Sequence, residues 1–509
     1  MLLKRIKPLE RILAESHDES KTNTLKKTLG AGSLMAMGIG AIIGTGIFVL
    51  TGVAAATRSG PALTLSFVVA GIVSALAALC YAEVASRIPI AGSAYTFTYA
   101  TLGEFIAWII GWDLVLEYAL GASTVSIGWS GYFTTFVKNV FGWIIPEQWQ
   151  HNYWDVGPTG LPIHGIMNLP AFCIILLIGV LLYRGTRESA LVNNIIVVIK
   201  VSVVLFFIAL GSGHVNPSNW VPYFPFGING MLGGAAFIFF AYIGFDAVST
   251  AAEETKNPKR DLPIGILGSL AVCTILYIIV VAILTGMVPY NQLNVPSPVA
   301  FAMDHVGLGW ASTIISIGAL AGLTTVLLVM MFGQTRIFFA MSRDGLLPAT
   351  FSKVHPKYRT PGTSTIIFTI MIAFIAAFTP INVVGSLANM GTLAAFILVS
   401  VALPILRKRY PGTDGFTVPF GPYVIPVLSA VSAFLLMLYL SVGSPMAYIP
   451  LPFGFSTSAA GAPSTWSQLN FALPLPWMGF LVWLLIGWAI YFLYSRSHSN
   501  VGREEALNK

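Results

Sequence analysis

Long runs of apolar residues separated by short polar connections dominate this chain of 509 residues. A helix needs roughly 17–25 mostly apolar residues to cross about 30 Å of hydrocarbon. Twelve segments of the chain meet this requirement, and they are residues 30–55, 62–87, 99–137, 168–183, 189–211, 231–252, 264–288, 310–341, 364–380, 383–406, 423–443 and 477–495. The pattern therefore predicts an all-α polytopic membrane protein with twelve transmembrane helices.

Composition supports the same fold class. Only 9% of the residues are charged and 56% are hydrophobic, whereas a soluble domain has about 25% charged residues. So few charges cannot cover the surface of a soluble protein of this size. The net charge of +7 does not indicate a nucleic-acid-binding protein, because the basic residues stand between the apolar segments instead of on one soluble face. Composition thus excludes a soluble enzyme, a nucleic-acid-binding protein and a disordered chain.

The positions of the Lys and Arg residues predict the orientation in the membrane. Of the 27 Lys and Arg residues, all but Arg58, Lys138 and Lys200 fall on one side when the twelve segments alternate in direction. Cytoplasmic connections are enriched in these residues. We therefore expect a multi-pass protein of the plasma (inner) membrane, with a cytoplasmic N-terminal arm (1–29) and a cytoplasmic tail (496–509).

Two of the twelve segments contain signals for broken helices. The first is dense in glycine and includes Gly44-Thr45-Gly46 at its centre, where each glycine weakens a helix by about 1 kcal/mol relative to alanine. Close helix packing through Gly40-x-x-x-Gly44 is the alternative interpretation. The sixth segment has Gly244 followed by Asp246 at membrane depth. Irregular backbone inside a bilayer is tolerated only where protein covers it or where it lines a cavity.

Two breaks five segments apart predict an inverted repeat of five plus five helices. The repeats would be residues 30–211 and 231–406, followed by two further helices in residues 423–495. Amides at the start of a half-helix favour an anion, and carbonyls freed at a break favour a cation. An α-amino acid carries both charges, so we expect it to bind between the two breaks.

Ionisable residues inside the predicted spans are candidates for coupling. Lys200 lies about 16–18 Å from either end of its segment, and burial favours the neutral amine, which makes it a proton-coupling candidate; permanent pairing is the alternative. Glu117 shares a helix face with Asp113. It either has a functional role, as a proton acceptor or a gate, or makes a structural hydrogen bond. Asp246 is either a gate or a helix cap. Thr324 and Thr325 either line the site or bond to the preceding turn.

The sequence gives no indication of a metal, a cofactor or catalytic residues. The three cysteines lie in apolar segments without partners at metal-ligand spacing. All seven histidines lie outside the predicted spans, and neither an HExxH nor a GxSxG motif occurs. The connection 444–476 is rich in Pro, Gly and Ser and suggests no function. These observations argue against a membrane-embedded enzyme.

Five segments carry motifs that are specific in combination, namely GIGAIIGTGIF, YAEVASRIPIAGSAYTFTYATLGEFIAWIIGWDLVLEY, RESALVNN, GFDAVSTAAEETKNPKRDLPIGI and FGQTRIFFAMSRDGLLP. Together they resemble the amino acid–polyamine–organocation permeases, and within them the cationic amino acid transporter family in a prokaryotic twelve-span form. The resemblance implies a LeuT-like inverted-repeat fold, alternating access and amino acid uptake.

The resemblance also implies roles for particular residues. The backbone at Ile43, Gly44, Thr45 and Gly46 would bind the substrate carboxylate, and carbonyls of Phe240, Ala241 and Ile243 the α-amino group. Lys200 matches the lysine that replaces the second sodium site in proton-coupled members. Met330 would narrow the side-chain pocket, and no carboxylate is expected to face that pocket, so small neutral amino acids are favoured over cationic ones.

The sequence thus predicts a proton-coupled symporter that imports L-amino acids, with protons in place of sodium as the coupling ion. An exchanger of amino acids is the nearest alternative, and an ion channel is a more distant one. The expected partners are the amino acid and the lipid bilayer; a small membrane subunit stays an open question.

Overall fold

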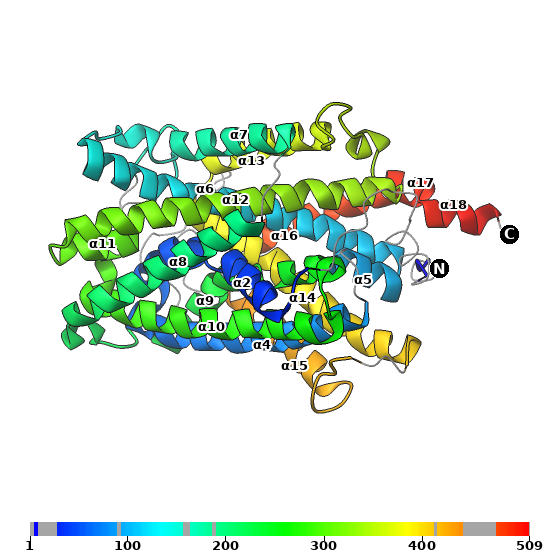
Figure 1. Ribbon diagram of the computed structural model, residues 1–509, viewed down its shortest axis with the longest axis horizontal. Helices are drawn as coiled ribbons and strands as arrows, with labels where there is room; N and C mark the ends of the chain where they lie inside the picture. The colour runs from blue at the N-terminus through cyan, green and yellow to red at the C-terminus, as the bar shows by residue number, and fades with distance from the viewer. Residues whose placement is uncertain are drawn as a thin grey trace, which may run out of the picture.

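The computed structural model describes residues 5–8, 28–88, 93–155, 163–185, 190–411, 415–440 and 475–507. Over these residues the chain is helical, and the only β-type pairing among them is an isolated bridge between Leu29 and Thr255. Most helices run along the long axis of the molecule, and both chain termini lie at the same end (Figure 1). The expected connection 444–476 falls almost entirely outside the described residues.

Eight helical stretches of the described residues are long and apolar enough to cross a membrane. They are Gly46–Arg87, Glu104–Phe141, Ile195–His214, Gly227–Ser249, Pro258–Met287, Gly309–Arg343, Ile381–Arg409 and Pro476–His498. Four shorter apolar helices accompany them, namely α2 (Ala31–Ile42), α7 (Leu169–Arg184), α13 (Gly362–Phe378) and α15 (Val424–Tyr439). Together these helices overlap the twelve apolar segments of the sequence, with shifted bounds.

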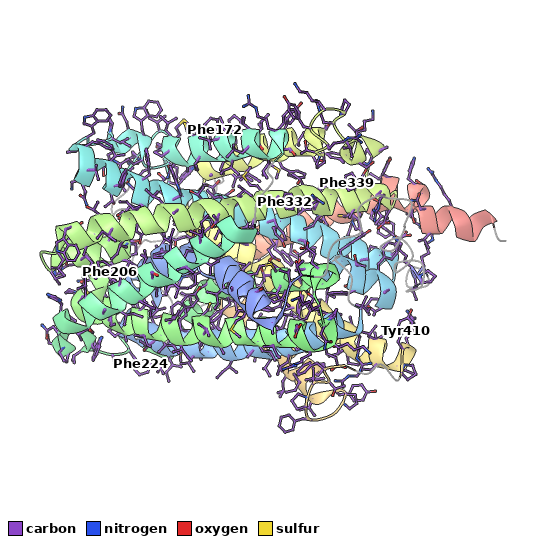
Figure 2. The ribbon with its side chains drawn as sticks, in the orientation of Figure 1. Phe172, Phe206, Phe224, Phe332, Phe339 and Tyr410 are labelled. Carbon is purple, nitrogen blue, oxygen red and sulfur yellow. The ribbon has the colours of Figure 1, made fainter. Side chains whose placement is uncertain are left out.

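Individual helices within the long stretches have their own bounds. These are α4 (Leu63–Arg87), α6 (Glu104–Phe141), α8 (Ala190–Gly211), α9 (Gly227–Ile238), α10 (Pro258–Met287), α12 (Gly309–Arg343), α14 (Ile381–Arg409) and α16 (Leu475–Ile490). Large apolar side chains on their outer faces are exposed, for example Ile72 (57%), Leu485 (59%) and the labelled Phe332 (40%) of Figure 2. Such a surface suits contact with lipid, because soluble proteins rarely expose apolar patches of this extent.

The first and sixth segments are interrupted at the predicted places. Helix α2 ends at Ile42, Ile43 is extended (φ −71°, ψ 101°), and helical turns resume as η1 (Gly46–Leu50), α3 (Thr51–Ala54) and η2 (Ala55–Ser59). The sixth segment consists of α9, the 3-10 turn η7 (Phe239–Tyr242) and the 3-10 helix η8 (Asp246–Glu254). Gly244 lies between η7 and η8 with φ +118°, a conformation that favours glycine.

The structure corrects the predicted bounds of the third segment. Residues 99–137 do not form one helix, because α5 (Ser93–Thr101) ends before Gly103, whose φ of +95° lies outside the helical region, and α6 starts at Glu104. The apolar pattern alone does not reveal this boundary. A second helix not singled out from the sequence, α11 (Pro298–His305), lies before α12.

Side chains from both ends of the chain meet at the start of α6. The buried carboxylate of Glu104 accepts hydrogen bonds from Arg5 (3.3 Å), Tyr99 (3.2 Å), Tyr491 (3.0 Å) and Ser499. We call these five residues the terminal cluster. Burial, together with the nearby carboxylates, raises the pKa of the Tyr99 hydroxyl, so it stays protonated and donates. The cluster joins the N-terminal residues, α5, α6 and the segment that follows α16.

Candidate functional site

The two helix breaks pack backbone against backbone. A Cβ atom added to Gly46 would lie 2.3 Å from Cα of Ala241, and one added to Gly244 would lie 2.9 Å from the carbonyl carbon of Ala41. Each break therefore presents a glycine to the half-helix of the other segment. This contact brings together the two sets of residues predicted to bind one ligand, which are Ile43, Gly44, Thr45 and Gly46 on one side and Phe240, Ala241 and Ile243 on the other.

Carbonyl groups around the first break receive hydrogen bonds from side chains of three other helices. The Tyr277 hydroxyl of α10 donates to the Ile42 carbonyl (2.8 Å), and the Tyr132 hydroxyl of α6 donates to the Phe48 carbonyl (2.7 Å). The Lys200 ammonium of α8 donates to the Gly40 carbonyl (2.8 Å). These bonds fix the two half-helices relative to the surrounding helices, because a buried carbonyl without a donor is costly.

The second break is held from α14 and α4. The Asn389 side-chain amide donates to the carbonyls of Ala236 (3.0 Å) and Phe237 (2.7 Å), at the end of α9. The Tyr242 hydroxyl donates to the Phe67 carbonyl (2.8 Å). Asn389, Tyr132 and Tyr277 were not among the residues predicted from the sequence. An asparagine within an apolar segment was the one signal that could have indicated such a role.

Thr45 offers a free hydroxyl at the first break. Its Oγ1 is buried and has no hydrogen-bond partner among the described residues. The Thr45 side chain packs against Gly128 of α6, where an added Cβ would lie 2.9 Å from the threonine methyl carbon. Buried polar groups almost always have a partner. The Thr45 hydroxyl is therefore available to a bound ligand.

Helix α12 covers the breaks from one side. A Cβ on Gly44 would make an ordinary contact with Val326 at 3.4 Å. Met330 lies one turn farther along α12, is 8% exposed, and directs its sulfur toward Gly121 of α6. Met330 thus lies one turn from the residue that contacts Gly44, and its role in a side-chain pocket stays a prediction. Ile43, Phe240, Ala241 and Ile243 are likewise buried, so this structure represents a form in which the breaks are closed to solvent.

Lys200 is buried beside the first break. Its side chain is 1% exposed, its aliphatic part packs against Gly322 of α12, and its ammonium reaches Gly40 as described above. Gly40 lies on α2, one turn before Gly44 at the break. Both predicted interpretations, proton coupling and permanent pairing with a carbonyl, are compatible with this geometry.

Three buried carboxylates lie together on the other side of the breaks. Asp113, Glu117 and Asp246 are 1%, 4% and 7% exposed, and Glu117 interacts electrostatically with both of the others. Thr392 of α14 lies near Glu117, and backbone amides at the start of η8 lie near Asp246. Electrostatic interaction between Glu117 and Asp246 thus links α6 and η8. The gating role of both residues stays a prediction.

Thr324 and Thr325 bond to the preceding turn of α12. The Thr324 hydroxyl donates to the Leu320 carbonyl (2.7 Å) and accepts from the Trp129 indole (3.0 Å). The Thr325 hydroxyl donates to the Gly322 carbonyl (2.8 Å). In this conformation both hydroxyls already have partners, as one of the two predicted alternatives states.

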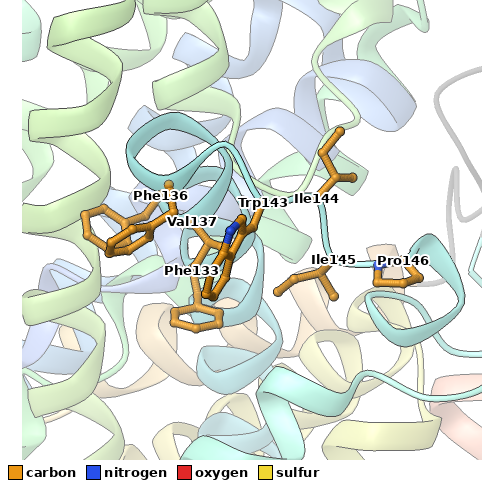
Figure 3. A pocket seen from close by; sticks show the side chains of 8 residues that line it. Phe133, Phe136, Val137, Trp143, Ile144, Ile145 and Pro146 are labelled. Carbon is orange, nitrogen blue, oxygen red and sulfur yellow. The ribbon is translucent and has the colours of Figure 1, made fainter.

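Two surface hollows lie away from the breaks. Figure 3 shows one of about 580 Å³ at the end of α6, with an apolar lining that includes Phe133, Phe136 and Trp143. A second lies at the start of α10. The described residues contain no group of three or more His, Cys, Asp or Glu side chains arranged to hold a metal ion.

Comparisons with known proteins match most of the chain to permeases and transporters. A family model described as amino acid permease matches residues 29–483. The chain is 48% identical over 506 residues to the branched-chain amino acid permease BcaP of Bacillus subtilis (98% of this chain, 99% of the relative). It is 46% identical over 497 residues to the methylthioribose transporter of the same organism (97% and 98%). It is 41% identical over 400 residues to the vacuolar cationic amino acid transporter 4 of Arabidopsis thaliana (77% and 64%).

Proposed function

The chain belongs to the amino acid permease family, and we propose that it imports neutral L-amino acids together with protons by alternating access. The observation that carries this proposal is the backbone contact between the two helix breaks, beside the unpartnered Thr45 hydroxyl. Proteins of this family are transporters, and the relatives are named as transporters or permeases rather than enzymes.

In the proposed site the substrate bridges the two breaks. Amides and the hydroxyl at Gly44, Thr45 and Gly46 bind the carboxylate, because the start of a half-helix carries a partial positive charge. Carbonyls of Phe240, Ala241 and Ile243 bind the ammonium group. Met330 limits the length of the substrate side chain.

Proton coupling is proposed to run through Lys200. The Lys200 ammonium occupies a position beside the first break where a sodium ion would otherwise be needed. When Lys200 loses its proton, its hydrogen bond to Gly40 weakens and α2 is released from α8. Glu117 and Asp246 participate in gating because they connect the scaffold helix α6 to η8. Thr324 and Thr325 participate because they belong to the wall of α12 behind the site.

We propose a topology of twelve transmembrane helices in the plasma membrane with both termini in the cytoplasm. Residues 30–211 and 231–406 form the two inverted repeats of a LeuT-like fold, and residues 423–495 add the last two helices. Residues 1–29 and 496–509 are the cytoplasmic arm and tail. The reciprocal contacts Gly46–Ala241 and Gly244–Ala41 support this arrangement, because they have the form expected of two related segments that cross.

The relatives suggest two substrate classes. Branched-chain amino acids fit the proposed site, because they carry the two charges that the breaks bind and an apolar side chain for the Met330 pocket. Methylthioribose, which the Bacillus subtilis relative is named for, is a sugar thioether without either charge, so it would leave the amides and carbonyls of the breaks without ionic partners. We therefore expect valine, leucine or isoleucine to be preferred.

Uptake into proteoliposomes tests this function. When the outside is more acidic than the lumen and the lumen contains no amino acid, the wild-type protein should accumulate radiolabelled leucine. A protonophore should abolish this accumulation. An absolute requirement for amino acid inside the vesicle would instead identify an exchanger. Conductance without saturable uptake would identify a channel. Competition by unlabelled methylthioribose stronger than that by isoleucine would overturn the proposed substrate class.

A further inference from the structure

A groove with cationic and apolar walls lies at the start of α10. The surface hollow there has a volume of about 500 Å³ and is lined by Lys259, Arg260, Pro263, Ile264, Leu267 and, from the segment after α14, Phe416. The backbone amide of Lys256 donates to the Leu29 carbonyl (2.8 Å), so the groove begins beside the start of α2. None of these residues belongs to the breaks or to the carboxylate group described above.

The two basic side chains of the groove are exposed and have no hydrogen-bond or ion-pair partner in the described part of the chain. The acidic residue next to them, Asp261, accepts a hydrogen bond from the backbone amide of Asn257 (3.3 Å). Donors of both Lys259 and Arg260 are therefore free to bind an anion. Elsewhere on this end of the molecule basic groups such as Lys7 and Arg407 are paired with carboxylates.

The rest of the groove is apolar and belongs to a helix that is long and apolar enough to cross the membrane. Ile264 is 39% exposed, and Leu267 and Phe416 are partly buried beside it. The basic side chains thus stand at the end of the helix, and the apolar surface continues from them along α10. A ligand that matches both parts needs a negatively charged head and a hydrocarbon chain.

We propose that this groove binds an anionic phospholipid of the phosphatidylglycerol type. Its phosphate lies between the Lys259 ammonium and the Arg260 guanidinium, and one acyl chain lies along Ile264, Leu267 and Phe416. Basic residues at the membrane surface attract anionic headgroups, and a guanidinium forms paired hydrogen bonds with phosphate oxygens. A free phosphate ion would use the basic residues and leave the apolar wall uncovered, so the lipid is the better match.

The location of the groove lets a bound lipid support the packing of α10 against the half-helices. Gly268, which also lines the groove, faces Met35 of α2, because an added Cβ would lie 2.6 Å from the Met35 methyl carbon. The amides of Thr28 and Leu29 donate to the Glu254 carbonyl at the end of η8 (2.9 and 3.0 Å). A bound lipid therefore supports α10 where it meets both half-helices, and it stabilises the closed arrangement. This effect rests on the proposed alternating access, whereas the binding site does not.

Thermal unfolding of the full chain in detergent tests the binding. Phosphatidylglycerol should raise the unfolding temperature of the wild type, and phosphatidylcholine and inorganic phosphate should not. In K259Q/R260Q the apparent affinity for phosphatidylglycerol should fall by about 25-fold, since each basic residue contributes about fivefold. The matched control K353Q/K357Q removes two exposed charges away from the groove and should respond as the wild type does.

Further variants distinguish charge from shape. The exchanged pair K259R/R260K should keep its response to phosphatidylglycerol, which shows that the charges are recognised and that the groove tolerates substitution. Equal stabilisation of K259Q/R260Q and wild type by phosphatidylglycerol would overturn the proposal. Stabilisation by phosphatidylcholine to the same extent as by phosphatidylglycerol would also overturn it. So would full stabilisation by inorganic phosphate alone. None of these results depends on transport activity, so failure of the lipid site and failure of the proposed function are separable.

Discussion

The ammonium nitrogen of Lys200 lies 2.8 Å from the carbonyl oxygen of Gly40, one turn before the first helix break. This bond connects α8 to the half-helix α2, which the proposed mechanism requires to move. A protonated lysine can hold the half-helix, and a change in its protonation changes that connection. Lys200, a lone basic residue of an apolar segment, thus connects α8 to α2 through one specific hydrogen bond.

Replacing Lys200 by Ala should abolish accumulation driven by a pH gradient, because the bond to Gly40 is lost. We expect at least a tenfold decrease in proteoliposome uptake, and the exposed control Lys353→Ala should transport as the wild type does. Ligand-induced thermal stabilisation would show whether the folded variant still binds leucine. Gradient-driven accumulation at the wild-type level in Lys200→Ala would assign the residue a purely structural role.

Alanine substitutions at the first break should differ sharply between neighbouring glycines. Gly46→Ala places a Cβ 2.3 Å from Cα of Ala241, and neither backbone can yield without separating the two breaks. Gly44→Ala places it 3.4 Å from Val326, an ordinary contact. We expect Gly46→Ala to lose transport by more than about tenfold and to unfold at a lower temperature. Equal activity of the two variants would contradict the contact between the breaks.

Asn389→Ala should destabilise the protein by about 1–3 kcal/mol, because the amide that bonds to Ala236 and Phe237 disappears. The exposed Asn139 makes a single long bond to Ser312 (3.4 Å) and provides a matched control. Thermal unfolding in detergent, with and without leucine, measures both effects. If Asn139→Ala and Asn389→Ala unfold at the same temperature, the amide of α14 does not hold the second break.

Glu104→Ala should lower the free energy of unfolding by at least about 2 kcal/mol, because four side-chain donors lose a buried charged acceptor. Glu147→Ala removes an exposed carboxylate from a connecting segment and should have little effect. Limited proteolysis near the C-terminus should also accelerate in Glu104→Ala only. An unchanged cleavage rate would show that the terminal cluster does not hold the C-terminal segment.

The sequence predicted the helices and the two breaks because both depend on local features. Apolar runs of sufficient length specify the helices, and Gly44, Gly46 and Gly244 weaken them at defined points. The boundary at Gly103 was missed, because a single glycine between two apolar helices does not interrupt the hydrophobic pattern. For the candidate site, sequence supplied the residues at the breaks but not their support. Asn389 and Tyr277 act on carbonyls more than 150 positions away along the chain, and no local pattern encodes such pairs.

The terminal cluster has a consequence for the biosynthesis of the protein. Arg5 donates to the carbonyl of Arg496, 491 positions later, and also to the carboxylate of Glu104. During translation residues 5–8 leave the ribosome before Glu104, and Glu104 stays without its full set of donors until α16 has been inserted and residues 495–499 have emerged. Closure of the cluster therefore follows the insertion of α16. A chain stalled before that step leaves the Glu104 carboxylate without its donors Tyr491 and Ser499.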